Sequence, residues 1–373
     1  MGKELSQGKA PGGQAKKPAK PKRLFMKQRN MLRVLYALIP VFLAGIYFFG
    51  WRVSVLVGVC IVAGVGTEYV MARRRGAPIS TACLVSCCLY GLSLPPTMPF
   101  WMAVVGIVVG ILFGKEVFGG FGRNFANPAI VGRVFVYVAF PIEMTGRFVP
   151  VFRGWLGGFG KWSMAGAASL PEWLSIQGQE TLNALTAATP MWAKRDFGYE
   201  TSLGQLFFGN IGGIFEGEGA KRVLAAGSVG EVSAALIILA GVYLLVTRTA
   251  NWRLMVSPLA AGAVTAALLR YAGGVEAVPT IPFVLCSGAF LYGAVFMVTE
   301  PVSAPKKTLS IWIYGGVIGV LIVLLRWKSQ FAGAVGFAIL LGNICGPCLD
   351  MAVGAWKNRK KLAEGQAGEA KRK

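Results

Sequence analysis

The sequence predicts an all-α membrane protein of about ten transmembrane helices, in two groups of five with a long outward-facing loop between them. Hydrophobic residues make up 55% of the chain, the mean hydropathy is +0.58, and 50 of the 373 residues are glycine. A soluble domain has too little interior to bury so much apolar surface. The composition therefore indicates a chain that crosses a membrane many times.

The net charge of +22 is concentrated at the two ends of the chain. Residues 1–33 hold ten Lys or Arg and one Glu, and residues 357–373 hold seven Lys or Arg and two Glu. Basic tails beside apolar spans are topology signals and attract anionic lipid. Membrane lipid, and not nucleic acid, is therefore the expected partner of this charge. We expect residues 1–31 to be a disordered basic cytoplasmic tail and residues 356–373 to be a second basic cytoplasmic tail.

The apolar windows that can cross ~30 Å of hydrocarbon fall into two sets. The first membrane half is residues 32–141, the outward loop is residues 142–230, and the second membrane half is residues 231–355. The equal halves are compatible with an internal repeat, but no residue-level self-similarity establishes one. The expected spans are about 32–50, 53–71, 79–95, 100–118 and 128–141, then 231–247, 254–272, 279–298, 309–326 and 331–351.

Lys and Arg in the short loops set the orientation of the spans. With the N-terminus inside, the inward loops carry most of these residues, and the outward loops carry few. The distribution predicts that both termini are cytoplasmic and that the 142–230 loop faces outward. The inward set is Arg73, Arg74, Arg75, Lys115, Arg123, Arg248, Arg253, Lys306 and Lys307, and the outward set is Arg52, Arg270 and Lys328.

The chain contains no histidine, which excludes His-ligated haem, carboxylate–histidine di-iron sites and His-based zinc. Five of the seven cysteines lie in apolar runs and are expected to be small buried hydrophobes. Residues 345–348, Cys-Gly-Pro-Cys, have the spacing of a redox dithiol motif, but they end an apolar span and do not open a helix after a strand. We interpret them as a helix break in a membrane segment, and we predict no metal site.

A run of small residues lies in the long polar loop. It is Asn183-Ala184-Leu185-Thr186-Ala187-Ala188-Thr189-Pro190. Small neighbours on both sides of Thr189 leave its hydroxyl on an open piece of backbone, where a modifying enzyme could attach a bulky group. Short runs of Ala, Ser and Thr are also common in ordinary loops, so this run needs support from other motifs.

Four further stretches supply that support. With the small-residue run, they resemble the NqrB/RnfD family over roughly residues 30–355. The Lys-Glu-Val-Phe-Gly-Gly run and Gly132-Arg133 look more like NqrB, a membrane subunit of the Na⁺-translocating NADH:quinone reductase, than like RnfD. The four stretches are Phe113–Gly120 with Asn124–Ala129 and Gly132-Arg133, Phe207–Asn210 with Gly227–Glu231, Phe296–Ala304, and Asp350.

The resemblance implies a flavin-carrying subunit of a redox-driven Na⁺ pump in a bacterial inner membrane. FMN would be bound through a phosphoester to Thr189, a riboflavin would be bound without a covalent link, and ubiquinone would be the substrate. NADH would be oxidised on another subunit of the complex. The sequence differs from the family pattern at Asn183 (usually Asp), at Thr186 (often Ser) and at Ala187 (often Gly), and residues 213–226 look like an outward insertion. No residue spacing locates the riboflavin or the quinone, and no catalytic residue is predicted.

Residues that follow Thr189 could hold the flavin. Lys194 and Arg195 lie close enough in sequence to neutralise its phosphate, and Trp192 could stack on its ring, as could Phe197 or Tyr199. The alternative is that these aromatic residues are interfacial anchors.

Acidic residues in or beside spans are costly and therefore indicate a function or a partner. Glu116, Glu300 and Asp350 each end a span that runs inward, and together they could attract Na⁺ at the cytoplasmic face. Alternatively, Glu116 pairs with Lys115 or Arg123, and Glu300 pairs with Lys306 or Lys307. Glu68 and Glu231 are expected to serve the structure, the latter near a helix N-terminus.

Two other functions stay open. An RnfD-type subunit would carry the same flavin in an ion-translocating ferredoxin:NAD oxidoreductase. A secondary transporter would use the spans and their glycines as a solute path and would carry no redox cofactor. Ultraviolet fluorescence of the denatured protein in a gel separates the transporter from the two flavoproteins.

Overall fold

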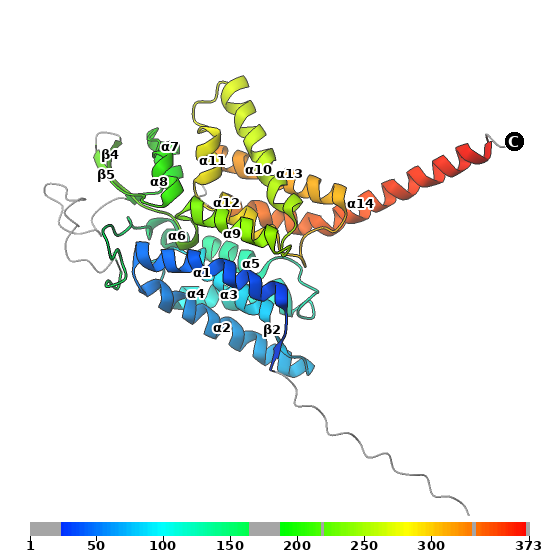
Figure 1. Cartoon of the computed structure of the whole chain (residues 1–373), viewed down its shortest axis with the longest axis horizontal. Coiled ribbons are helices and arrows are strands. Elements are labelled where there is room, and N and C mark those ends of the chain that lie inside the picture. The colour runs from blue at the N-terminus through cyan, green and yellow to red at the C-terminus, as the bar shows by residue number, and fades with distance from the viewer. Residues whose placement is uncertain (1–23, 164–186, 218–219, 330–332, 371–373) are drawn as a thin grey trace, which may run out of the picture.

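The computed structural model describes residues 24–163, 187–217, 220–329 and 333–370, and Asn183 and Thr186 lie outside these ranges. The described chain is mostly helical and forms two groups of helices that pack side by side (Figure 1). The first group is α1 (Arg29–Phe49), α2 (Arg52–Arg75), α3 (Thr81–Leu92), α4 (Phe100–Ile111) with the π-helical turn η1 (Leu112–Glu116), and α5 (Pro128–Ala139). The second is α9 (Ala234–Val246), α10 (Trp252–Ala267) with the π-helical turn η6 (Leu268–Ala272), α11 (Ile281–Cys286), α12 (Phe290–Tyr292) with the π-helical turn η7 (Gly293–Met297), α13 (Thr308–Lys328) and α14 (Ala334–Ala370).

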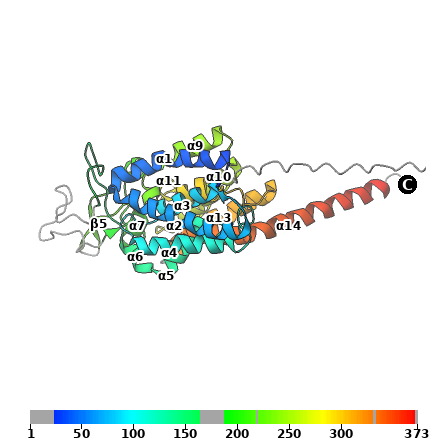
Figure 2. The same cartoon turned by 90° about the horizontal axis from the view of Figure 1, so that it is seen from below.

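The chain between the two groups gathers at one end of the bundle, which we call the outer end (Figures 1 and 2). A small sheet in the order β3-β5-β4 lies there, with β3 parallel and β4 antiparallel to β5. The expected insertion at 213–226 is the β4–β5 hairpin. The elements of this region are α6 (Pro141–Gly146), β3 (Ala187–Ala188), α7 (Pro190–Phe197), α8 (Leu203–Phe208), β4 (Ile214–Gly217), β5 (Ala220–Leu224) and the 3₁₀ turn η5 (Val229–Glu231).

The opposite end, which we call the inner end, carries a pair of short parallel strands. Strand β1 (Phe25–Met26) pairs with β2 (Ile79–Ser80), which directly precedes α3. The Thr81 hydroxyl donates to the Met26 carbonyl at 2.7 Å, and the Ala82 N–H donates to the Gln28 side chain at 3.0 Å. These bonds fix the residues before α1 beside the start of α3.

Membrane-type helices account for most of the expected spans. Among the described residues, five helices are long and apolar enough to cross a membrane, and three shorter apolar helices accompany them. The chain is therefore a multi-pass membrane protein, whereas the count of ten crossings and the domain boundaries stay predictions. The five are Arg29–Phe49, Arg52–Arg75, Trp252–Ala272, Thr308–Lys328 and Ala334–Glu364, and the shorter three are Thr81–Leu92, Pro128–Ala139 and Ala234–Val246.

The span expected at 279–298 is not one continuous helix. Helix α11 stops at Cys286, Ser287 is extended (φ −89°, ψ 141°), and the chain resumes as α12 and η7. Gly288 has φ +60°, a conformation that favours glycine, so the local sequence permits this interruption.

The interpretation of residues 345–348 as a helix break is wrong. Helix α14 runs without interruption from Ala334 to Ala370 with Pro347 inside it. Proline removes one backbone donor from a helix but does not always end it, because neighbouring groups can satisfy the freed carbonyl. Cys345 and Cys348 are both exposed.

Each group contains a pair of long parallel helices, and the pair in the second group runs opposite to the pair in the first. Helices α2 and α4 lie parallel, since Arg52 at the start of α2 donates to the Pro96 and Met98 carbonyls just before α4, and Arg75 at the end of α2 pairs with Glu116. Helices α10 and α13 are parallel in the same way, because the Trp252 and Trp312 rings near their starts meet edge to face at 6.0 Å.

The two parallel pairs start at opposite ends of the bundle. Helix α1 starts where α9 ends, since Arg33 donates to the Thr247 carbonyl at 2.8 Å. The short α9–α10 connection therefore lies at the inner end, where α2 and α4 finish. The structure thus contains an inverted repeat, which the sequence did not establish.

Close helix packing depends on glycine at a few contacts. A Cβ on Gly110 of α4 would clash with the Pro128 carbonyl, and one on Gly319 of α13 would clash with the Pro258 carbonyl. Small residues let helix backbones approach in membranes, where packing drives association. The Asn127 side chain caps α5 through the Ala129 N–H and donates to the Met297 carbonyl, so it also joins the two groups.

The orientation can be tested with two exposed tryptophans at opposite ends of the bundle, Trp155 and Trp356. In intact cells, a cysteine in Trp155→Cys should react with a membrane-impermeant thiol reagent, whereas one in Trp356→Cys should react only after permeabilisation. The reason is that the inward loops carry most of the Lys and Arg. Labelling of the parental protein is the control, and the reverse pattern would contradict the predicted topology.

Candidate functional site

A cavity of about 470 Å³ opens at the outer end, where the chain between α6 and α9 meets the two groups of helices. Its walls come from α5, α7, α13, α14 and the interruption after α11. Ligand sites of this kind commonly lie between helices of bundles and have volumes of about 300–1,000 Å³. The polar residues that line it include Thr189, Trp192, Arg195, Arg133, Glu231 and Arg326.

Thr189 lies at the wall of this cavity as the residue that precedes α7. Its backbone is extended (φ −70°, ψ 160°), Pro190 occupies the first helical position, and the Thr189 side chain makes no capping hydrogen bond. Proline is favoured there because it lacks the N–H that would be unpaired. The Thr189 hydroxyl is therefore half-buried, uncommitted as a cap, and next to the first backbone N–H groups of an eight-residue helix.

Arg195 brings positive charge to the same wall. Its guanidinium forms a two-bond pair with Asp196 and donates to the Ser329 carbonyl at 3.1 Å. The hydrogen bond from Arg195 lowers the pKa of Asp196, and the same bond raises the pKa of Arg195. Asp196 also lines the cavity, so the local charge is nearly balanced.

Lys194 does not line the cavity, although it is next to Arg195 in sequence. Its ammonium pairs with Glu200 at 3.2 Å, and Thr280 donates to the same carboxylate at 2.9 Å. Burial raises the pKa of Glu200, but the hydrogen bonds from Thr280 and Lys194 outweigh burial and lower it overall. Through Glu200, Lys194 thus connects α7 to Thr280 at the start of α11.

Of the three aromatic residues considered for ring stacking, only Trp192 lines the cavity. The Phe197 and Tyr199 rings lie 5.8 Å and 4.8 Å from the Phe215 ring, so they pack against the β4–β5 hairpin.

Two further arginines reach the cavity from inside the bundle, and the sequence predictions missed both. Arg133 on α5 donates to the Ser93 carbonyl at the end of α3 and to the Ser228 hydroxyl. Arg326 on α13 donates to the carbonyls of Val284 and Ser287, both at 3.0 Å. Each arginine supplies donors to a short helix that ends inside the bundle. A charged residue in an apolar run was the signal that could have identified them.

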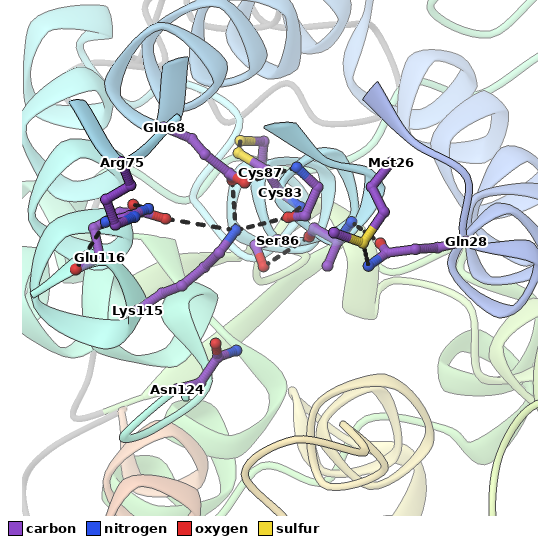
Figure 3. A network of polar contacts seen from close by, with 12 residues as sticks. Met26, Gln28, Glu68, Arg75, Cys83, Ser86, Cys87, Lys115, Glu116 and Asn124 are labelled. Carbon is purple, nitrogen blue, oxygen red and sulfur yellow. Dashed lines mark hydrogen bonds and ion pairs between the residues drawn. The ribbon is translucent and has the colours of Figure 1, made fainter. Parts of the chain in front are cut away.

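The inner end contains a network of buried charges, shown in Figure 3. The Lys115 ammonium donates to Glu68 Oε2 at 2.5 Å and to Ser80 Oγ at 2.7 Å, while the Ser80 N–H donates to Glu68 Oε1 at 2.8 Å. The Lys115 and Glu68 side chains are 1% and 3% exposed. Glu68 therefore has an ion-pair partner 47 positions away in sequence, which no local pattern indicates.

Glu116 lies beside this pair with different partners. Its Oε2 pairs with Arg75, and its Oε1 lies 3.8 Å from the Lys115 ammonium and makes no hydrogen bond. The alternative that Glu116 pairs with Lys115 is therefore confirmed at ion-pair distance, and Arg75 is the other partner in place of Arg123.

Glu300 and Asp350 have other partners again. Glu300 accepts from the Asn124 amide at 2.9 Å and from the Ser303 hydroxyl at 2.7 Å, and the described residues give it no ion pair with Lys306 or Lys307. Asp350 instead accepts the backbone N–H groups of Lys306 and Lys307. Among the residues that the structure describes, the three carboxylates share the inner end but make no contact with one another.

Comparison with known proteins identifies relatives along most of the chain. A family described as "NQR2, RnfD, RnfE family" matches residues 22–357. The chain is 34% identical to the D-type subunit of the "Ion-translocating oxidoreductase complex" of Aeromonas hydrophila, with 87% of this chain and 92% of that protein covered. It is 32% identical to the B-type subunit of the "Na(+)-translocating NADH-quinone reductase" of Pseudoalteromonas atlantica, with 87% of this chain and 71% of that protein covered.

The role of Arg326 can be tested with Arg326→Met, which should lower the thermal unfolding midpoint of the protein in detergent. The carbonyls of Val284 and Ser287 would lose their donors, and each buried acceptor left unpaired costs about 1–3 kcal/mol. Lys328→Met, an exposed change on the same helix, is the matched control and should have little effect. Equal midpoints for both variants would show that water or another group satisfies these carbonyls.

Proposed function

Because this chain belongs to the NQR2, RnfD, RnfE family, we propose that it is the flavin-carrying membrane subunit of a redox-driven Na⁺ pump. Electrons from NADH, oxidised on another subunit, would pass through FMN bound to Thr189 and towards ubiquinone, and this transfer would drive Na⁺ across a bacterial inner membrane. A second flavin, riboflavin, would be bound without a covalent link. The protein would act within a multi-subunit complex, with both of its termini in the cytoplasm.

The environment of Thr189 carries the flavin part of the proposal. A phosphoryl group on its hydroxyl would lie at the N-terminus of α7, where backbone N–H groups and the helix dipole favour negative charge. Arg195 on the same wall brings a guanidinium that is paired with Asp196, and Trp192 offers an aromatic face. The cavity beside them has the volume expected for a cofactor, so the residues present fit FMN.

FMN, when bound, supplies the electron transfer, and the protein supplies its binding and electrostatics. Arg195 would share its guanidinium between Asp196 and the phosphate, and Arg133 and Arg326 would make the inner wall of the cavity positive. Glu231, an acidic residue of the same cavity, accepts the Ser228 N–H at 2.5 Å. We expect the arginines to favour a ring that gains electrons.

The ion-transport part of the proposal is supported by the relatives and by the inner end. Both relatives are described as members of ion-translocating or Na⁺-translocating complexes. Glu116 offers a buried oxygen without a hydrogen bond, and hard cations prefer oxygen ligands. We propose that Glu116, Glu300 and Asp350 belong to the cation pathway from the cytoplasm.

An RnfD-type subunit is the second candidate. The chain is 34% identical to the D-type subunit from Aeromonas and 32% identical to the B-type subunit from Pseudoalteromonas, so both candidates have support. Such a subunit would carry the same flavin but would exchange electrons with ferredoxin. Purification of the complex and identification of its other subunits by mass spectrometry would separate the two.

The inverted repeat is also typical of secondary transporters. A transporter without a redox cofactor would show no fluorescence in a denaturing gel under ultraviolet light, whereas a covalent flavoprotein would fluoresce.

We predict that Thr189→Ala gives a membrane-inserted protein that lacks covalent flavin, because the hydroxyl that forms the phosphoester is gone. Intact-protein mass and in-gel fluorescence, measured in cells that contain a flavin transferase, check this. Thr145→Ala is the matched control, since Thr145 lines the same cavity and its hydroxyl donates to the Pro141 carbonyl. A parental mass equal to that of the bare polypeptide would refute the proposal, and flavin retained in Thr189→Ala would move the attachment to another residue, such as Thr186.

We also predict that Glu116→Gln, Glu300→Gln and Asp350→Asn each raise the Na⁺ concentration for half-maximal turnover of the complex. A charge-assisted contact contributes about 1–3 kcal/mol, so a shift of roughly tenfold is expected. Flavin content and assembly should not change. Glu364→Gln, an exposed carboxylate on α14, is the control. An unchanged Na⁺ response in all three variants would mean that these acids only hold the structure.

A further inference from the structure

In the inner-end network, the Lys115 ammonium lies 3.8 Å from Glu116 Oε1, an oxygen that makes no hydrogen bond. We propose that Glu68 is a positioning residue that holds the Lys115 ammonium away from Glu116 Oε1 and so keeps this oxygen available to a small hard cation such as Na⁺. This inference rests on the proposed cation pathway and adds two residues to it.

The distances define which carboxylate holds the ammonium. Lys115 Nζ lies 2.5 Å from Glu68 Oε2 and 3.8 Å from Glu116 Oε1, so only the contact with Glu68 has hydrogen-bond length. Ser80 Oγ accepts a further bond from Nζ at 2.7 Å on the Glu68 side. The ammonium therefore has two good acceptors there and needs none from Glu116.

Glu68 itself is fixed by the start of α3. Its Oε1 accepts the N–H of Ser80, the residue that caps α3, at 2.8 Å. The side chain is 3% exposed, so it has little room to follow Lys115 elsewhere. The position of the ammonium is thus determined by the α2–α3 contact.

Glu116 is held in a complementary way. Arg75 occupies Oε2, while Oε1 is buried and without a hydrogen bond, and the carboxylate is fully shielded from solvent. A buried carboxylate oxygen without a hydrogen bond is costly, and a bound cation would reduce that cost. Without Glu68, Lys115 would have Glu116 Oε1 as the nearest remaining carboxylate, and Na⁺ would have to displace a tethered ammonium.

The experiment uses the purified complex and measures the Na⁺ concentration for half-maximal turnover and the Na⁺-induced rise in thermal midpoint. Glu68→Gln keeps an acceptor for the Ser80 N–H but loses the charge that holds Lys115. Both readouts should shift to about tenfold higher Na⁺, which corresponds to about 1.4 kcal/mol.

The double variant Glu68→Gln with Lys115→Met separates positioning from folding. It removes the competing ammonium, so its Na⁺ response should return to the parental value or below. A purely structural role for Glu68 would leave the double variant as impaired as the single one, and that result would overturn the inference. If Glu116→Gln shifts the Na⁺ response but Glu68→Gln does not, the inference fails while the cation pathway stands. If Glu116→Gln has no effect, the pathway itself fails.

Discussion

Every backbone carbonyl that lies inside a membrane needs a donor, and this requirement governs the centre of the molecule. Helix α3 has 12 residues and α11 has six, so both end within the bundle and leave carbonyls without helical partners. Arg133 serves the end of α3, and Arg326 serves the end of α11. A guanidinium can satisfy two carbonyls at once and keep its charge. Because both arginines line one cavity, the same residues that complete the fold also give that cavity its positive wall.

At the inner end, the buried charged groups are paired with groups of opposite charge and not with backbone carbonyls alone. Arg75 and Lys115 face Glu68 and Glu116 in a site that is almost closed to solvent. Buried ion pairs give little net stability but are costly to break. Their value here is geometric, because they fix α2, the start of α3 and η1 in one arrangement. The π-helical turn η1 contributes directly, since it contains both Lys115 and Glu116, and such turns are frequent at functional sites.

Local sequence patterns predicted the multi-pass membrane class and the long spans, because apolar length alone determines them. They failed where a contact between distant segments decides the outcome. At the interruption, the Ser287 carbonyl accepts from Arg326, 39 residues later, and α14 continues through Pro347, which no local pattern indicated. At the site, Thr189, Trp192 and Arg195 line the cavity, whereas the interactions of Lys194 and Glu68 involve partners brought close only by the fold. The family motif at Asn127 has a visible cause, since its side chain caps α5 and bonds to the Met297 carbonyl.

Helix α14 is one stiff rod of 37 residues, and its last part extends beyond the bundle (Figure 1). At 1.5 Å per residue it is about 55 Å long, well over the ~30 Å of a hydrocarbon core. Its membrane part touches α5 and α13 beside the cavity, and Asp350 clamps it to the chain at Lys306 and Lys307. The clamp lies between the cavity and the basic end of α14, so a tilt of the helix beside the cavity would also move that end.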